Sequence, residues 1–120
     1  MAKGKIEYNL VERTARFGES VIVFAKSVPS GAVTTPLVGQ VVRSATSIGA
    51  NYCEADDAES GKDFRHKIGL CQKESKETKH WLRMIAAAEP QLRDAARKLW
   101  QEAKELNLIF GAILQTQRNK

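Results

Sequence analysis

Glu77 and His80 have the residue types and the spacing of iron ligands in helical bundles, where a Glu-x-x-His motif projects two ligands from one helix. A complete di-iron site needs a second such motif and two further carboxylates on facing helices. The other histidine, His66, lies on the same predicted helix about four turns away and cannot supply that motif. His80 also falls on the face opposite Thr78 and Leu82. We therefore expect no metal site.

Other sequence patterns of catalytic sites are missing. The chain has no glycine-rich phosphate loop, no nucleophile elbow and no Cys-x-x-Cys pair, and no serine stands in a recognisable motif with a histidine and an acid. Cys53 and Cys71 are isolated, and we expect both to be reduced thiols. Cys71 falls at a core position, where a thiol usually serves as a small hydrophobic side chain. We expect a protein that is not an enzyme and uses no cofactor, although a triad formed only in space stays open.

A basic row follows the outer face of the predicted third helix, opposite its apolar stripe. Its members are Lys62, Arg65, His66, Lys73, Lys76, Lys79, His80 and Arg83. Segregated positive charge on a chain of net charge +5 attracts a phosphate backbone, so RNA or DNA is a candidate partner. The alternative is a solvated helix face without a ligand. Because no aromatic residue is interleaved in the row, base stacking is not predicted.

Charge is segregated along the rest of the chain as well. The end of the predicted second helix is acidic, whereas the last predicted helix adds the cations Arg93, Arg97, Lys98 and Lys104. Trp81 and Trp100 each lie beside an apolar stripe, so packing is the favoured role of both. Nothing in the sequence indicates recognition of particular bases.

Apolar residues recur at alternating spacings of three and four, which is typical of amphipathic helices in a bundle. The stripe of the last helix is Leu92, Ala96, Leu99, Ala103, Leu106, Phe110 and Ile113, and that of the third is Phe64, Ile68, Cys71, Ser75, Thr78, Leu82 and Ile85. The first helix offers Tyr8, Val11, Ala15, Gly18, Ile22 and Ala25, widened by Phe17, Val21, Phe24 and Val28, and the second offers Leu37, Val41, Ala45, Ile48, Tyr52 and Ala55.

These stripes predict helices over about 7–28, 36–58, 61–88 and 90–117, and no strand. Short connections make neighbouring helices antiparallel, and the 3.5-residue repeat favours left-handed packing at about +20°. We expect an all-α, up-down-up-down antiparallel four-helix bundle that forms one domain over residues 1–120. Thr35-Pro36 and Ser60-Gly61-Lys62-Asp63 are the expected N-terminal caps of the second and third helices.

The predicted second helix carries little charge, since Arg43 is the only charged residue between Pro29 and Cys53. Its outward positions are instead Val38, Val42, Thr46, Gly49 and Ala50. A contiguous apolar surface usually marks a contact with another molecule, so we expect these residues to form an interface between copies of the chain. The alternative is a mildly polar surface of short neutral residues.

A polar row follows one flank of the same helix. It consists of Gln40, Arg43, Ser44, Ser47, Asn51 and Glu54, and the third helix places Glu74 and Glu77 on the flanks of its stripe. A buried Arg43 would need a carboxylate partner, because an unpaired buried charge is costly. We expect these eight residues to form a structural network with Arg43 paired to Glu77 or Glu74. A binding pocket is the alternative.

The run from Gln40 to Ala55, QVVRSATSIGANYCEA, resembles the signature of the four-helix-bundle family encoded in intervening sequences of bacterial large-subunit rRNA genes. The match covers about residues 30–85 and continues through Ser60, Asp63, Phe64, Lys67, Glu74, Glu77, Thr78, Trp81 and Leu82. The resemblance implies a homo-oligomer, with a pentamer as the expected form. This family is similar to the basic accessory proteins of diversity-generating retroelements, which bind nucleic acid. It implies no catalytic residues.

Composition sets the remaining expectations. With 120 residues, 42% of them hydrophobic and 28% charged, the chain suits one folded domain. No apolar run reaches the length of a membrane span, and no apolar signal segment follows the basic N-terminus, so we expect a cytoplasmic protein without a membrane partner. Nucleic-acid binding through the basic row is the favoured function. A protein-interaction or structural scaffold without nucleic acid is the alternative.

Overall fold

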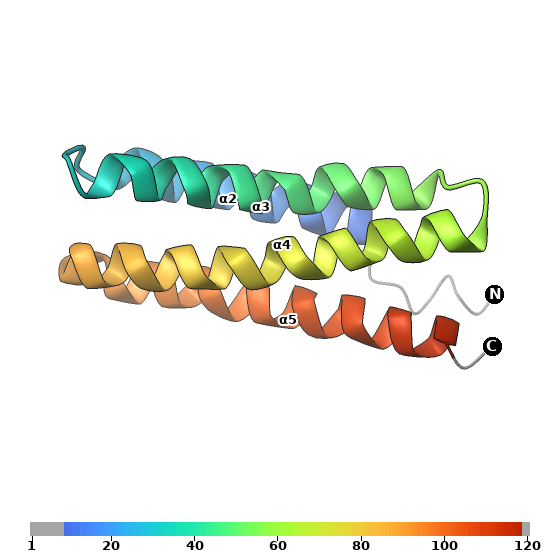
Figure 1. The fold of residues 1–120 in the computed structure, drawn as a ribbon. Coiled ribbons are helices and arrows are strands. Elements are labelled where there is room, and N and C mark those ends of the chain that lie inside the picture. Colours follow the sequence, from blue (N-terminus) through green and yellow to red (C-terminus); the bar gives the residue numbers. More distant parts are fainter. Residues whose placement is uncertain (1–8, 119–120) are drawn as a thin grey trace.

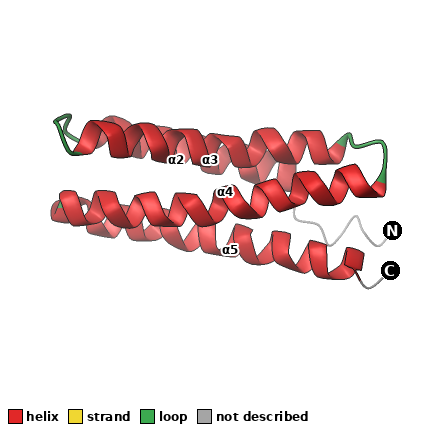
Figure 2. Ribbon diagram, in the orientation of Figure 1, coloured by secondary structure: helices red, strands yellow, loops and turns green. Residues whose placement is uncertain are grey.

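Four long helices lie side by side and alternate in direction, as the computed structural model shows for residues 9–118 (Figure 1). They are α2 (Leu10–Ser27), α3 (Thr34–Asp56), α4 (Gly61–Ala88) and α5 (Arg93–Arg118), with the short 3-10 helix η1 (Pro90–Leu92) before α5. The molecule measures 47 × 24 × 21 Å. None of the described residues forms a strand (Figure 2), so the predicted all-α, up-down-up-down four-helix bundle is confirmed.

The helix ends confirm one predicted capping residue and shift two of the predicted helix bounds. Ser60 caps α4 as predicted, because its hydroxyl accepts a hydrogen bond from the N–H of Asp63 at 3.0 Å. The first helix begins at Leu10 with Asn9 as its cap, so its predicted first residues, Tyr8 among them, lie outside the described residues. Pro90 opens the single turn of η1 rather than α5 itself.

The predicted cap of the second helix was wrong. Helix α3 begins at Thr34, two residues before the proline, and its cap residue Val33 makes no side-chain hydrogen bond. The hydroxyl of Thr35 instead accepts a hydrogen bond from the N–H of Gly31 at 3.1 Å, and the hydroxyl of Thr34 donates one to the carbonyl of Pro29 at 2.5 Å. The threonines therefore hold the loop after α2, and the helix starts without a cap.

The core is formed by the predicted stripes of α3, α4 and α5. Phe110, Leu106, Ile48, Ile68 and Leu82 are fully buried. At about 25 cal/mol per Å² of apolar area, burial of such side chains supplies most of the stabilising free energy of the bundle.

Helix α2 turns the widened edge of its predicted apolar face to the core, rather than the centre of that face. Phe17, Val21 and Phe24 are buried, whereas Val11 and Ile22 are each 41% exposed. The large side chains of the wider stripe occupy the core because they bury more apolar area than the small side chains at the centre of the predicted stripe. The remaining apolar residues of α2 therefore line its outer surface.

No helix within the described part of the chain is long and apolar enough to cross a membrane.

Candidate functional site

The basic row of α4 lies on the surface, as the pattern predicted. Seven of its members are exposed and Lys79 is half-buried: Lys62, Arg65, His66, Lys73, Lys76, His80, Arg83 and Lys79. Helix α4 lies between α3 and α5, so its two flanks have different neighbours. Glu74 and Glu77 face α3, and the row borders the seam with α5. The carboxylates of Glu74 and Glu77 are thus directed toward α3 and away from the seam with α5.

One hollow on the α4/α5 seam is lined by lysines. It has a volume of about 500 Å³, and we name it the lysine hollow; its lining is Gly69, Gln72, Lys73, Lys76, Lys79 and Asn107. The amide of Asn107 donates hydrogen bonds to the Gln72 carbonyl at 2.9 Å and to the Ser75 hydroxyl at 3.0 Å. These bonds tie α5 to α4 beneath the three lysine side chains.

A second hollow on the same seam is lined by arginines. It has a volume of about 400 Å³, and we name it the arginine hollow; its lining is Leu82, Arg83, Ala86, Arg93, Ala96, Arg97, Trp100 and Gln101. Arg83, Arg93 and Arg97 are exposed, whereas Leu82 and Ala96 are buried. The hollow therefore combines an apolar floor with three cationic side chains. Together the two hollows form the α4/α5 groove.

Trp100 links the two hollows. The ammonium groups of Lys79 on α4 and Lys104 on α5 lie 5.2 and 5.7 Å from its ring centre, within cation–π range. The ring is half-buried and packs against the core, as predicted, but it also borders the arginine hollow. The basic row of α4 itself contains no aromatic residue, but Trp100 on the neighbouring helix α5 borders the same surface. The available signal was the position of Trp100 three residues after Arg97 and four before Lys104, which puts all three on one flank of α5.

The cations of the α4/α5 groove have no carboxylate partners. Over residues 9–118, none of Lys73, Lys76, Lys79, Arg83, Arg93 and Arg97 forms an ion pair. Three nearby carboxylates are engaged elsewhere, because Glu77 binds Arg43, and Glu102 and Glu105 bind Arg13. The groove therefore keeps its positive charge and attracts anions.

The two ends of the basic row have different surroundings. Lys62, Arg65 and His66 directly follow the acidic loop that contains Asp57 and Glu59. Next to them, Lys67 forms an ion pair with Glu54 at 2.6 Å, which raises the pKa of this lysine. The other end of α4, around Arg83, lies about 33 Å from its first residue, several Debye lengths away at physiological salt. The strongest candidate site is thus the part of the row that borders α5.

The polar row of α3 brings Arg43 to the predicted partners. Its guanidinium group donates a hydrogen bond to Glu77 at 3.1 Å and lies 3.7 Å from Glu74, while Gln40 accepts a weaker bond at 3.5 Å. The Arg43 side chain is 53% exposed, so it is not the buried charge that the sequence suggested, whereas the Glu74 side chain is 12% exposed. Exposed ion pairs contribute little to stability because water screens them.

The rest of the row is not joined through its side chains. The hydroxyls of Ser44 and Thr78 lie 2.9 Å apart in the core between α3 and α4. Ser47 and Asn51 instead donate hydrogen bonds to carbonyl groups one turn earlier on their own helix. Glu54 is bound to Lys67 near the end of α3. The bonds of Ser47 and Asn51 therefore end on the main-chain carbonyls of Arg43 and Ser47, and no described hydrogen bond joins their side chains to those of Ser44 or Glu54.

The predicted interface residues of α3 divide into two groups. Val38 and Val42 pack partly against the core. The other three, Thr46, Gly49 and Ala50, line an apolar groove of about 290 Å³, named the α2/α3 groove, together with Val11, Thr14, Ala15, Gly18, Glu19, Ile22 and Cys53. The helices approach closely there, since a Cβ atom on Gly49 would lie 3.3 Å from the Thr14 hydroxyl. The α2 half of this surface was missed because its residues were assigned to the core.

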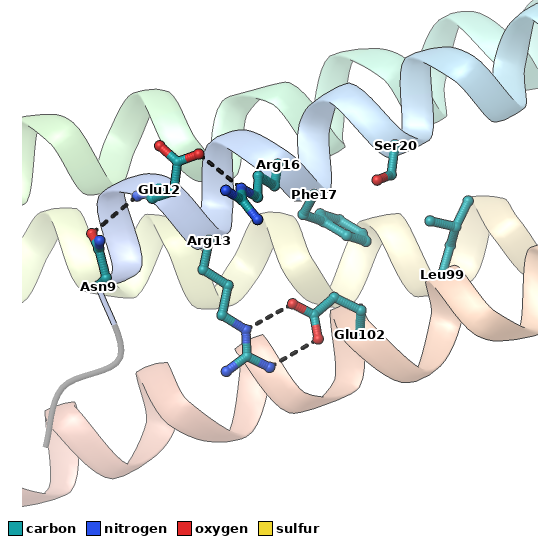
Figure 3. A pocket seen from close by; sticks show the side chains of 8 residues that line it. All are labelled: Asn9, Glu12, Arg13, Arg16, Phe17, Ser20, Leu99 and Glu102. Carbon is teal, nitrogen blue, oxygen red and sulfur yellow. Dashed lines mark hydrogen bonds and ion pairs between the residues drawn. The ribbon is translucent and has the colours of Figure 1, made fainter.

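A further hollow lies between α2 and α5 and has a volume of about 560 Å³ (Figure 3). Arg13 crosses it and forms two hydrogen bonds with Glu102, at 2.7 and 2.8 Å, and one with Glu105 at 2.8 Å. The bond to Glu102 is the main reason that the pKa of Arg13 is raised further above its ordinary value. Because two carboxylates already neutralise this arginine, the hollow is a structural seam and not an anion site.

Side chains for metal or thiol chemistry do not gather in the described structure. His80 contacts the edge of Trp81, with ring centres 4.8 Å apart, and residues 9–118 contain no group of three histidine, cysteine or acidic side chains that could hold a metal. Both cysteines are free thiols, with Cys53 exposed and Cys71 buried. Burial raises the pKa of Cys71 to about 12, so this thiol stays protonated and unreactive at neutral pH.

Comparisons with known proteins agree with this fold. The model of the family described as 23S rRNA-intervening sequence protein matches residues 7–112. A crystal structure of a protein of unknown function from the S23 ribosomal protein family of Bacteroides thetaiotaomicron is similar, with a TM-score of 0.78 and 27% sequence identity. The similarity covers 88% of this chain and 97% of that one. No match was found among curated proteins.

Proposed function

Because the chain belongs to the 23S rRNA-intervening sequence protein family, we propose that it is a non-enzymatic, homo-oligomeric bundle that binds RNA through the α4/α5 groove. The observation that carries the proposal is the set of unpaired cations along this groove, from Lys73 to Arg97. An RNA ligand suits a cytoplasmic protein, which is the location we propose.

Phosphate binding explains why so many cations occur without carboxylates. Neighbouring like charges repel one another and lower stability, and a monomeric helix surface normally intersperses both signs. Each phosphate that approaches the groove releases counterions, which provides favourable free energy without reading the sequence. We therefore expect non-specific binding, in which Lys73, Lys76 and Arg83 contact the RNA backbone.

Self-assembly is the second part of the proposal. The α2/α3 groove is apolar and exposed over both helices, with Ile22 41% exposed, and Ala50 is exposed on α3. Contiguous exposed apolar surface favours a contact, and a second copy of the chain is the occupant we propose. A pentamer, which the family resemblance implies, would repeat the basic groove around the assembly and strengthen binding through multivalency.

A scaffold that binds another protein and no RNA is the alternative. A separate apolar surface favours it: Leu108 is 61% exposed and borders a small hollow with Ile109, Ala112 and Ile113 near the end of α5. In that case the α4/α5 groove is only a solvated surface, and charge reversal in the groove leaves the function unchanged.

A matched pair of charge-reversal variants separates the two readings. Lys73→Glu with Lys76→Glu places two carboxylates in the groove, whereas Lys26→Glu with Lys98→Glu makes the same change in net charge at exposed positions outside it. Binding of a fluorescent RNA, followed by anisotropy, should be lost only in the first variant. Circular dichroism and sizing of both variants should match the wild type. Equal loss in both variants would show that net charge alone drives binding.

A further inference from the structure

We propose that the arginine hollow takes one unpaired nucleotide of a single-stranded RNA, with the base stacked on Trp100 and its phosphates bound by Arg83, Arg93 and Arg97. This inference rests on the proposed RNA binding and adds what kind of RNA is bound. It assigns the distinction between unpaired and paired RNA to Trp100 and not to any of the cationic residues.

The lining of the hollow matches the two halves of a nucleotide. The indole ring of Trp100 lies beside the buried residues Leu82 and Ala96 and supplies the flat apolar surface that suits the face of a base. Three arginines line the same hollow, and a guanidinium group binds phosphate oxygens through two hydrogen bonds. The volume of about 400 Å³ falls within the range of small-molecule sites.

The ring of Trp100 lies between the residues of α5 that line the arginine hollow and Lys104. Lys104 lies one turn after Trp100, whereas Ala96 and Arg97 of the hollow lie one turn before it. The cation–π contacts with Lys79, which lines the lysine hollow, and with Lys104 help to hold the ring in place. Trp100 also lines the arginine hollow, and this is where we place the stacked base.

A duplex cannot use this hollow in the same way. Bases within a duplex are paired and covered by their neighbours, so they cannot stack on a protein side chain without being unpaired first. A duplex can still contact the lysines and arginines through its phosphates. RNA recognition by this groove should therefore have two separable parts, namely a charge-dependent part common to all RNA and a stacking part confined to single strands.

Tryptophan fluorescence reports the stacking part directly. The chain has two tryptophans, so Trp81→Phe leaves Trp100 as the only tryptophan, whose emission is excited selectively at wavelengths that tyrosine does not absorb. The probe is an oligouridine of about 12 nucleotides, and its control is the same strand paired with an oligoadenosine of equal length. Both should bind at low salt, but only the single strand should quench the emission of Trp100.

A second pair of variants tests the same residue by affinity. Trp100→Leu keeps an apolar side chain but cannot stack, and it should weaken oligouridine binding by about 5- to 150-fold, the range for loss of one stacked base. Its affinity for the duplex should not change, and Trp100→Phe should recover much of the single-strand affinity. If Trp100→Leu does not fold, which circular dichroism would show, the quenching of native Trp100 decides the test.

The possible results separate this inference from the proposed function. Salt-dependent binding of both RNAs without quenching, and with no effect of Trp100→Leu, would overturn the nucleotide site but leave RNA binding by the groove intact. Absence of binding to either RNA at low salt would overturn both.

Discussion

The ammonium nitrogen of Lys79 on α4 lies 5.2 Å from the centre of the Trp100 ring on α5. This contact spans the seam between two helices and lies where the lysine hollow meets the arginine hollow. It places an aromatic ring within a surface whose cations have no acidic partners. The candidate site therefore depends on the packing of α4 against α5 and not on the basic row of α4 alone.

The first prediction concerns the core. Phe110 is fully buried, so Phe110→Ala should lower the free energy of unfolding by about 3–5 kcal/mol through lost burial and a cavity. Leu108 on the same helix is 61% exposed, so Leu108→Ala should change it by less than about 0.5 kcal/mol. Urea denaturation followed by circular dichroism measures both values. Equal losses in the free energy of unfolding for the two variants would show that α5 packs on the core through another face.

The second prediction compares two ion pairs between helices. Arg13 makes a two-bond contact with Glu102, and both side chains are about one-third exposed or less, at 26% and 32%. A double-mutant cycle with alanine at both positions should give a coupling of about 1–2 kcal/mol. The cycle for Arg43 and Glu77 should give about 0.2–1 kcal/mol, because the Arg43 side chain is 53% exposed. A larger coupling energy for Arg43 and Glu77 than for Arg13 and Glu102 would indicate that assembly buries Arg43.

The third prediction concerns the two thiols. Cys71 is fully buried and its pKa is raised to about 12, so a thiol reagent should not label it in the folded protein even at pH about 9. Cys53 is exposed in the single chain and lines the α2/α3 groove, so it should react in any dissociated subunit and be protected in the assembly. Mass spectrometry after brief labelling counts the modified residues. Native labelling of Cys71 would contradict its place in the core.

The fourth prediction concerns assembly. Light scattering on a sizing column should give a mass several times the 13.3 kDa of one chain. Ala50→Glu places a carboxylate on the α2/α3 groove and should dissociate the assembly, because an unpaired charge in an apolar contact is costly. Ser30→Glu adds the same charge to the exposed loop after α2 and should leave the mass unchanged. A wild-type chain that stays monomeric at micromolar concentration would contradict the proposed interface.

Much of the fold could be predicted because each helix carries a continuous apolar stripe. The bounds of α4 were predicted to the residue, since Ser60 is a strong cap and Glu89-Pro90 ends the helical pattern. Helix α2 is apolar on more than one face, so periodicity could not decide whether Ile22 or Val21 faces the core. The size of Phe17 and Phe24 decided it, and the sequence pattern gives size no weight.

The candidate site was predicted only in part. The basic row of α4 is a local pattern, and its exposure follows from helix geometry. The contribution of α5 depends on which of its flanks meets α4, and a single helix pattern does not contain that information. Trp100 shows the difficulty, because a residue on the edge of a stripe can pack on the core and still border a surface groove.

The salt dependence of RNA affinity tests the central claim most directly. For the wild type, the logarithm of the affinity for single-stranded RNA should fall linearly with the logarithm of the salt concentration. Lys73→Gln with Lys76→Gln should make this slope shallower by about 1.4, since each lost phosphate contact removes about 0.7. The same substitutions at Lys26 and Lys98 should leave the slope unchanged. Equal slopes for all three proteins, or no binding at the lowest salt, would contradict the α4/α5 groove as an RNA site.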